Sequence, residues 1–300
     1  MFLLFNLLKK NRLSNVLPFI SVTLMSRLIL TFQGIVILKL ISPSIMGIWI
    51  GLQLIQNYGI QCHFGILNGM SRQIPLYLGQ NAGDMASKIE AVARYNIFLL
   101  SGFGLVCVSI LFNSDLISDE SKSAVCAMIF ITIVRLNMEF HIGLFKARQQ
   151  FSKATWVVFA EAILMLITLP LVYFLELEGL LLRSLITALI LLILCLNLNS
   201  WSMFVRKDRA LTREVLIKGF PIMMLGFALV ILGSMDRMLI IRYLDTGSLG
   251  QYAIGLAVVS ILSLIPAFSG QAFYPKMVEI FSAQGISKEM LVMCGYASLI

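Results

Sequence analysis

The chain has 300 residues, and its composition excludes an ordinary soluble domain. Hydrophobic residues make up 59% of it and charged residues 13%, whereas soluble domains carry about 25% charged residues. The formal net charge of +8 requires no nucleic-acid partner, because basic loops that face anionic lipid account for it. The composition therefore predicts an all-α polytopic membrane protein.

Eight apolar runs long enough to cross a bilayer follow one another along the chain. A helix needs about 20 apolar residues to cross roughly 30 Å of hydrocarbon. The runs cover residues 16–40, 46–62, 95–112, 124–145, 154–175, 180–199, 220–241 and 251–273. A ninth run begins at residue 291 and stops halfway, which would leave unsatisfied backbone groups in lipid. We therefore expect a natural chain of about 400 residues, if a second six-helix repeat matches the first.

The loops between the runs differ in charge from one side to the other. Of the 23 Lys and Arg residues, sixteen fall in loops on the side of the N-terminus. Four are assigned to the opposite side: Lys39, Lys122, Arg183 and Arg242. Because Lys and Arg concentrate in cytoplasmic loops, this bias predicts a cytoplasmic N-terminus.

An internal repeat relates the two parts of the chain. Residues 36–55 resemble residues 239–258 at a shift of 203 positions, which places Gly47 on Gly250. Six predicted helices separate the copies, and this even number gives both parts the same orientation, as in parallel transporter repeats. The predicted domains are a six-helix N-terminal lobe at residues 1–200 and an incomplete C-terminal lobe at residues 201–300.

Charged side chains inside the predicted spans are candidate functional residues, since each costs about 2.5–3.5 kcal/mol to insert at a helix centre. Arg27 lies about halfway along the first span. Arg135 and Glu139 are four residues apart in the fourth, so they share a helix face and can form an ion pair. Asp236 and Arg237 lie toward the outer end of the seventh. Being adjacent, they cannot share a helix face, and we expect separate partners for them.

Three further residues complete the candidates. Glu161 and His141 lie near the predicted cytoplasmic edge, and Arg72 lies in a cytoplasmic loop. For all these charges a purely structural role, as an interhelical ion pair or a basic membrane anchor, stays open. The five cysteines show no metal-binding spacing, so neither a metal nor another cofactor is predicted.

Three sequence motifs resemble those of Wzx-type polysaccharide flippases, which belong to the multidrug/oligosaccharidyl-lipid/polysaccharide exporter superfamily. Residues 63–84 resemble the family's cytoplasmic "D-x-G-hydrophobic-x-x-G-x-x-R … G-x-x-G-D" signature, although His63 replaces the usual acidic residue. Residues 40–49 resemble its "L-s-P-x-x-x-G-x-W/Y" loop. Residues 234–252 resemble its "s-x-D-R-x-x-I … L-x-x-x-x-x-G-x-Y" element, which is the most specific of the three.

The resemblance implies twelve helices in two lobes, around a cleft that opens alternately to each side of the bacterial inner membrane. The implied cargo is an undecaprenyl-pyrophosphate-linked oligosaccharide, flipped to the periplasmic leaflet for O-antigen and lipopolysaccharide biosynthesis or a related polymer. The implied partners are membrane lipids, the polymerase and chain-length proteins of the pathway, and a coupling cation. No enzymatic activity and no ATP site are implied.

Guanidinium groups bind a pyrophosphate with several charge-assisted hydrogen bonds. The candidate substrate ligands in the cavity are Arg27, Arg135, Arg237 and Arg72. The candidates for holding these arginines or binding the coupling cation are Glu139, Asp236 and Glu161.

Other functions stay open. A cation-coupled multidrug antiporter of the same superfamily would need a more apolar cavity with an isolated acid, and Arg27 and Arg135 would repel its cationic cargo. A membrane polymerase or acyltransferase would need a concentrated catalytic constellation, and the chain has only two histidines. The third alternative is a non-transporting scaffold of a polysaccharide export complex.

Overall fold

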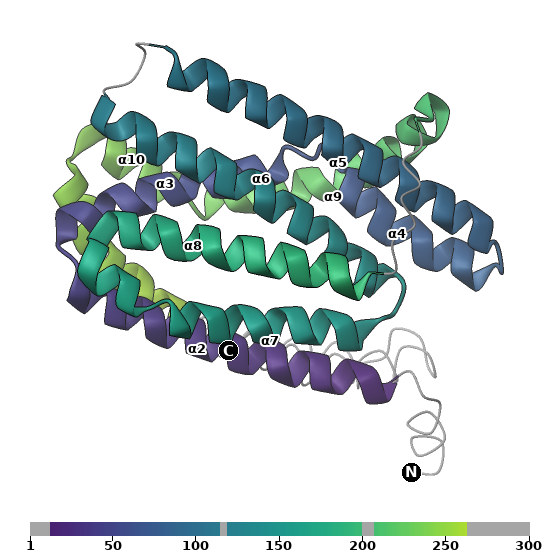
Figure 1. The fold of residues 1–300 in the computed structure, drawn as a ribbon, viewed down its shortest axis with the longest axis horizontal. Coiled ribbons are helices and arrows are strands. Elements are labelled where there is room, and N and C mark those ends of the chain that lie inside the picture. The colour runs from purple at the N-terminus through teal and green to yellow at the C-terminus, as the bar shows by residue number, and fades with distance from the viewer. Residues whose placement is uncertain (1–12, 115–118, 200–206, 263–300) are drawn as a thin grey trace, which may run out of the picture.

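The computed structural model describes residues 13–114, 119–199 and 207–262, and every regular element in these ranges is a helix. In chain order the helices are α2 (Leu13–Leu40), α3 (Pro43–Gln61), α4 (Ile66–Gly79), α5 (Gly83–Phe112), α6 (Asp119–Ala147), α7 (Phe151–Ile167), α8 (Pro170–Leu198), α9 (Arg209–Leu232) and α10 (Met235–Tyr243), and a last helix covers Thr246–Leu262. They form a bundle in which α6 lies between α5 and α8 (Figure 1). The predicted all-α fold is confirmed.

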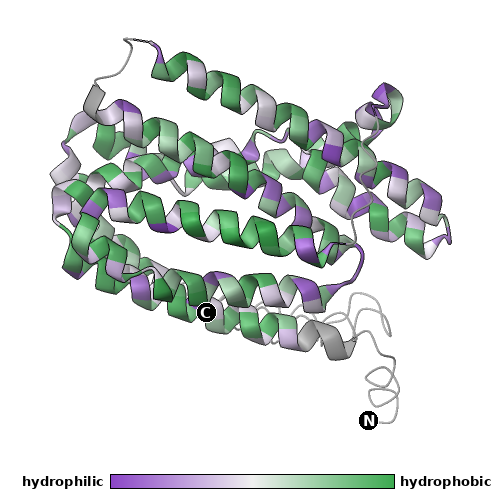
Figure 2. Cartoon of the chain, viewed as in Figure 1, coloured by the Kyte–Doolittle hydropathy of each residue, from purple (hydrophilic) through white to green (hydrophobic). Residues whose placement is uncertain are grey.

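Five of these helices are long and apolar enough to cross a membrane by length and composition. They are the helical segments Pro18–Leu40, Gly83–Phe112, Ser121–Ala147, Pro170–Leu198 and Arg209–Leu232. The predicted run 46–62 corresponds to α3, which has 19 residues but is not among these five, and the described part of the run 251–273 lies in the shorter apolar helix Thr246–Leu262. The ninth run lies outside the described residues. Apolar residues follow the lengths of the helices, and hydrophilic residues gather toward their ends (Figure 2), as expected for a multi-pass membrane protein.

The chain turns back within α8, at Glu176. This residue has φ 46° and ψ −113°, which no helix allows. Gly179 and Leu171 would lie about 12 Å apart along a straight helix. In the structure, a Cβ built on Gly179 would lie only 2.2 Å from the Leu171 carbonyl oxygen. The predicted runs 154–175 and 180–199 are therefore two antiparallel segments, the first made of α7 and the start of α8.

The seventh predicted span is also interrupted, between α9 and α10. The helix stops at Gly233 and resumes at Met235, with Ser234 buried in the joint. Pro221 lies inside α9 without ending it. The break therefore lies at a Gly–Ser pair, which is a common place for a kink.

Two glycines let α3 and the last helix cross with their backbones in contact, in what we call the Gly47–Gly250 crossing. A Cβ on Gly47 would lie 1.8 Å from the carbonyl oxygen of Thr246. A Cβ on Gly250 would lie 1.8 Å from the carbonyl oxygen of Pro43. The shift of 203 positions that relates Gly47 to Gly250 also relates Pro43 to Thr246. The contact is thus reciprocal, as in an interface around a two-fold axis.

A second crossing, the Gly65–Gly219 crossing, joins α4 to α9. Gly65 begins α4 with φ 92°, a left-handed conformation that glycine adopts without strain. A Cβ on Gly219 would lie 2.0 Å from the Gly65 carbonyl oxygen, and one on Gly69 would lie 2.2 Å from that of Val215. Small residues therefore allow these helices to pack backbone against backbone, and Gly65 and Gly69 have the GxxxG spacing that is typical of such contacts.

Candidate functional site

One cavity, which we call the arginine cavity, lies between α2, α3, α7, α8, α10 and the last helix. Its volume is about 540 Å³, within the usual range of ligand sites. Three guanidinium groups line it, those of Arg27, Arg183 and Arg237. The described residues of its wall include the polar side chains of Gln33 and Gln53, and none of them is acidic. The described part of the cavity is therefore strongly cationic.

Arg183 is the most deeply buried of the three, with 3% of its surface exposed. Its Nη2 donates to Gln33 Oε1 at 2.8 Å and to the Met165 carbonyl oxygen at 2.9 Å. Its Nε and Nη1 are buried and have no hydrogen-bond partner among the described residues. A buried cation with only neutral partners is costly, because no opposite charge offsets its desolvation. An anion in the cavity would supply that charge.

Sequence reasoning missed Arg183, because it assigned the residue to an outer loop. The structure corrects this: Arg183 lies inside the cavity wall, on the segment of α8 that follows the turn at Glu176. A usable signal was present in the sequence. Arg183 follows three leucines at the start of the predicted run 180–199, and Gln33 is a polar residue in the run 16–40.

Arg27 is exposed within the arginine cavity, on α2. No hydrogen bond or ion pair joins its side chain to another residue in the described ranges. Its guanidinium therefore keeps all five donors for a ligand. This is the position that the sequence predicted for a substrate-binding cation.

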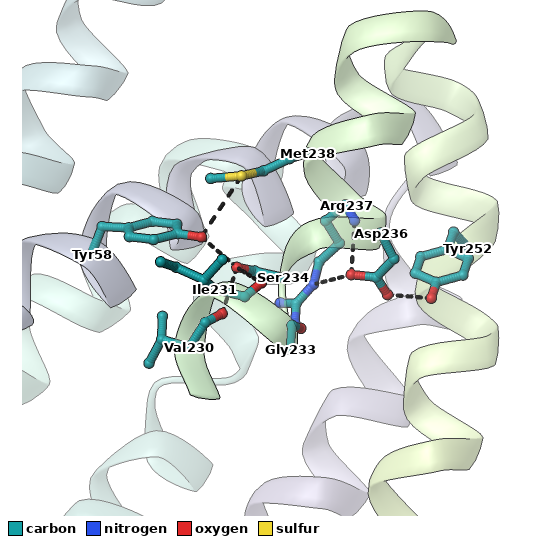
Figure 3. A network of polar contacts seen from close by, with 9 residues as sticks. All are labelled: Tyr58, Val230, Ile231, Gly233, Ser234, Asp236, Arg237, Met238 and Tyr252. Atoms are coloured by element: carbon teal, nitrogen blue, oxygen red, sulfur yellow. Dashed lines mark hydrogen bonds and ion pairs between the residues drawn. The ribbon is translucent and has the colours of Figure 1, made fainter. Parts of the chain in front are cut away.

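Arg237 and Asp236 interact with each other, which corrects the expectation of separate partners (Figure 3). Asp236 Oδ1 accepts the backbone N–H of Arg237 at 2.8 Å and lies 3.7 Å from its Nε. Arg237 Nη2 also donates to the Gly233 carbonyl oxygen, and Tyr252 donates its hydroxyl to Asp236 Oδ2. The helix break explains the arrangement, because Asp236 lies in the first turn of α10 with backbone donors still free.

Arg135 pairs with Glu161 of α7, at 3.1 Å between Nη2 and Oε1. The i,i+4 pair with Glu139 that the sequence predicted does not form, because the neighbouring helix supplies the carboxylate. The two side chains are only 18% and 19% exposed. Glu161 is therefore less exposed to solvent than its predicted place near the cytoplasmic edge suggested. Arg135 is also absent from the described wall of the arginine cavity. It is an interhelical ion-pair residue here, separate from the other candidate ligands.

A second cavity, the Glu139 cavity, lies between α3, α4, α6 and α9 and has a volume of about 490 Å³. Its wall includes Glu139, Arg72 and His63. His63 is 6% exposed, and its Nδ1 accepts the backbone N–H of Gly65 at 2.9 Å. Burial lowers the pKa of His63 to about 4, so the ring is neutral at pH 7. Of the candidate residues, Arg27 and Arg237 thus line the arginine cavity, and Arg72 and Glu139 line the Glu139 cavity.

A hydrogen bond joins α3 to the α9–α10 joint. Along both elements, its two residues lie between those that line the arginine cavity and those that line the Glu139 cavity. Tyr58 and Ser234 hydroxyls are 2.6 Å apart, and Tyr58 also lies 3.7 Å from Met238 Sδ (Figure 3). On α3, residues up to 53 line the arginine cavity and residues 60–61 line the Glu139 cavity. Across the joint, Gly226 lines the Glu139 cavity and Arg237 the arginine cavity. We call this bond the Tyr58–Ser234 contact.

One comparison with known proteins finds a match, to a family model. The model of the family described as "polysaccharide biosynthesis protein" matches residues 82–281, two thirds of the chain. No curated protein and no solved structure gives a significant match. With apolar helices long enough to span a bilayer and this family match, the chain is a multi-pass membrane protein of the polysaccharide biosynthesis protein family.

Proposed function

We propose that the chain is a Wzx-type flippase, which moves an undecaprenyl-pyrophosphate-linked oligosaccharide from the cytoplasmic to the periplasmic leaflet of the bacterial inner membrane. The N-terminus lies in the cytoplasm in this proposal, as the loop charges favour. The polysaccharide biosynthesis family and the helical membrane fold support a transporter of polysaccharide precursors rather than an enzyme.

The observation that carries the proposal is the arginine cavity. Three arginines without an acid in the described wall fit an anion with several charges, such as a pyrophosphate. Arg27 offers a guanidinium with no bonded partner in the described ranges, and Arg183 offers two buried N–H-bearing atoms without partners. The lipid tail of the cargo would stay in the bilayer while its polar head occupies the cavity.

Alternating access is supported by the two cavities and the contact between them. The Glu139 cavity lies toward the basic loops, and the arginine cavity lies toward the opposite helix ends. The reciprocal Gly47–Gly250 crossing supports two lobes related by a two-fold axis, which is the arrangement that rocks in parallel-repeat transporters. A cationic drug is a poor cargo for such a cavity, because three arginines would repel it.

The proposal is tested by complementation in a strain that makes the matching lipid-linked unit but lacks its own flippase. The natural full-length protein should restore the polymer. Arg27→Gln should reduce polymer at least about tenfold, because a charge-assisted hydrogen bond contributes roughly 1.5–3 kcal/mol. Arg27→Lys should retain part of the activity, since it keeps the charge. Arg27 has no described partner, so Arg27→Gln should insert normally.

The matched control is the double variant Arg135→Gln/Glu161→Gln, which removes an intramembrane arginine outside the arginine cavity. Cells that express this double variant at the membrane abundance of the wild-type protein should still make the polymer. Full activity of Arg27→Gln would contradict the cavity's role. Absence of polymer together with raised resistance to cationic dyes would favour the antiporter, and a covalent product on a labelled acceptor would favour an enzyme.

A further inference from the structure

The Glu139 cavity has a wall that differs in chemistry from the wall of the arginine cavity. Its volume of about 490 Å³ is within the usual range of small-ligand sites. Its described polar side chains are two amides, a hydroxyl, an imidazole, a carboxylate and a guanidinium: those of Gln61, Asn68, Ser71, His63, Glu139 and Arg72. Only the last two are charged at pH 7, and their charges are opposite. The described wall therefore has no net charge.

Helix spacing brings these groups to one place. On α4, Asn68 is followed by Ser71 and Arg72 three and four residues later, so the three share a helix face. On α6, Glu139 and Gly143 are four residues apart, and both line the same cavity. A Cβ built on Gly143 would lie 3.5 Å from Ser71 Oγ, so the two helix faces meet there.

Most of the polar side chains in this wall make no bond within the protein. Of the six, only His63 has a hydrogen-bond partner in the described ranges, the backbone N–H of Gly65. Glu139 forms no hydrogen bond or ion pair there, because Arg135 pairs with Glu161 of α7 instead. The amides, the hydroxyl, the carboxylate and the guanidinium of the wall therefore keep their donors and acceptors for a ligand.

This set of groups favours a ligand that both donates and accepts hydrogen bonds. Amide and hydroxyl groups do both, whereas a carboxylate only accepts and a guanidinium only donates. A simple anion would face the like charge of Glu139, and a cation would face that of Arg72. A sugar ring matches the wall, because each of its hydroxyls donates and accepts. Its C–H faces suit the apolar part of the wall, which includes Leu67 and Met223.

We propose that the Glu139 cavity binds the carbohydrate end of the cargo, with Gln61, Asn68 and Glu139 hydrogen-bonded to sugar hydroxyls. The inference rests on the proposed flippase function, and it divides recognition of the cargo between two cavities. The arginine cavity binds the pyrophosphate by charge, and the Glu139 cavity binds the sugar by hydrogen bonds. Because no described residue lines both cavities, each can be altered alone.

The test compares two lipids that differ only in the sugar: the lipid-linked unit extracted from the complementation strain, and undecaprenyl pyrophosphate. Binding of each to the purified full-length protein is measured at pH 7 by native mass spectrometry. Wild type should bind the lipid-linked unit about tenfold more tightly, as expected for two net hydrogen bonds to the sugar. Asn68→Leu and Glu139→Gln should each lower this preference about fivefold and leave undecaprenyl pyrophosphate binding unchanged.

A pair of glycine variants tests the space in the cavity. Gly226 lines it, and a Cβ built there meets nothing within 4 Å among the described residues, so Gly226→Leu should fill the space and remove the preference. Gly102→Leu is the matched control, because a Cβ on Gly102 also meets nothing described and Gly102 does not line the cavity. Arg27→Gln should weaken both lipids equally, since its cavity recognises the group that they share.

The outcomes separate this inference from the proposed function. Equal binding of the two lipids by wild type would overturn the inference and leave the flippase proposal intact, because the shared lipid pyrophosphate is still bound. If neither lipid binds, both proposals fail. Equal weakening of the two lipids by Asn68→Leu would also overturn the inference, since the cavity would then act on the shared part of the cargo. The same holds if Gly226→Leu behaves like Gly102→Leu.

Discussion

Replacing Gly47 by Ala should force α3 and the last helix apart. A Cβ at Gly47 would lie 1.8 Å from the Thr246 carbonyl oxygen, where real Cβ contacts are essentially never under 3.0 Å. The two backbones must therefore separate by at least about 1.2 Å. The obstructing atoms belong to the backbone, so no side-chain rotation relieves the clash. The same holds for a Cβ at Gly250 against the Pro43 carbonyl oxygen.

The magnitude follows from two opposing effects. Alanine in place of glycine inside a helix stabilises by about 0.5–1 kcal/mol, while overpacking a close contact costs about 1–3 kcal/mol. Gly47→Ala should therefore be destabilising on balance. Gly34→Ala is the matched control, because a Cβ on Gly34 meets nothing within 4 Å among the described residues. It should be neutral or stabilising by up to about 1 kcal/mol.

The assay is thermal unfolding of the full-length protein in detergent for Gly47→Ala, Gly250→Ala, the double variant and Gly34→Ala. The two crossing variants should each lower the melting temperature. The double variant should cost less than their sum, because the first substitution has already opened the shared contact. If Gly47→Ala has the same melting temperature as Gly34→Ala, the two backbones do not cross at this distance and the reciprocal contact is wrong.

Three further perturbations test the contacts around the cavities. Tyr58→Phe should cost about 1 kcal/mol, and a double-mutant cycle with Ser234→Ala should show coupling; additivity would argue against the 2.6 Å bond. Since the folded pKa of His63, about 4, lies below its ordinary 6.5, the unfolded state binds more protons, and stability should fall by up to about 3 kcal/mol as the pH drops from 6.5 to 4. In thermal unfolding measured over this pH range, His63→Asp should lose less stability than wild type. If the stability of the two proteins falls in parallel with pH, His63 does not cause the loss. Arg135→Gln should destabilise more than Arg135→Gln/Glu161→Gln, because only the single variant leaves a poorly solvated carboxylate unpaired; equal melting would contradict the pair.

The helical architecture was accessible from the sequence because apolar length determines which segments can span a bilayer. The boundary between the runs 154–175 and 180–199 was placed correctly around Glu176, where the polar residues of the turn interrupt the apolar pattern. The interruption of the seventh span was not predicted. The break lies at Gly233 and Ser234, a Gly–Ser pair that hydropathy does not record, and Ser234 there contacts Tyr58 of α3.

The ion pairs show that spacing within one helix does not identify a partner on another helix. Arg135 and Glu139 satisfy the i,i+4 rule, yet a carboxylate on α7 takes the place of the local partner. Arg183 was taken for a loop residue, whereas in the structure it is buried and donates to Gln33, 150 positions away in the chain. Local spacing identifies which charges are able to meet within a helix, whereas the packing of other helices decides which charges do meet.

The distribution of charge also constrains how an anionic cargo would pass through the proposed flippase. The Glu139 cavity combines Arg72 with a carboxylate, whereas the arginine cavity has three cations and no described acid. An anion moving toward the arginine cavity would therefore gain electrostatic stabilisation, and the Tyr58–Ser234 contact lies between the residues of α3 that line the two cavities. Because hydroxyl hydrogen bonds contribute only about 1 kcal/mol each, the cargo's gain at one arginine is enough to offset breaking this contact. Ser234 keeps its bond to the Val230 carbonyl oxygen when Tyr58 leaves, so opening exposes no unsatisfied serine hydroxyl in the joint.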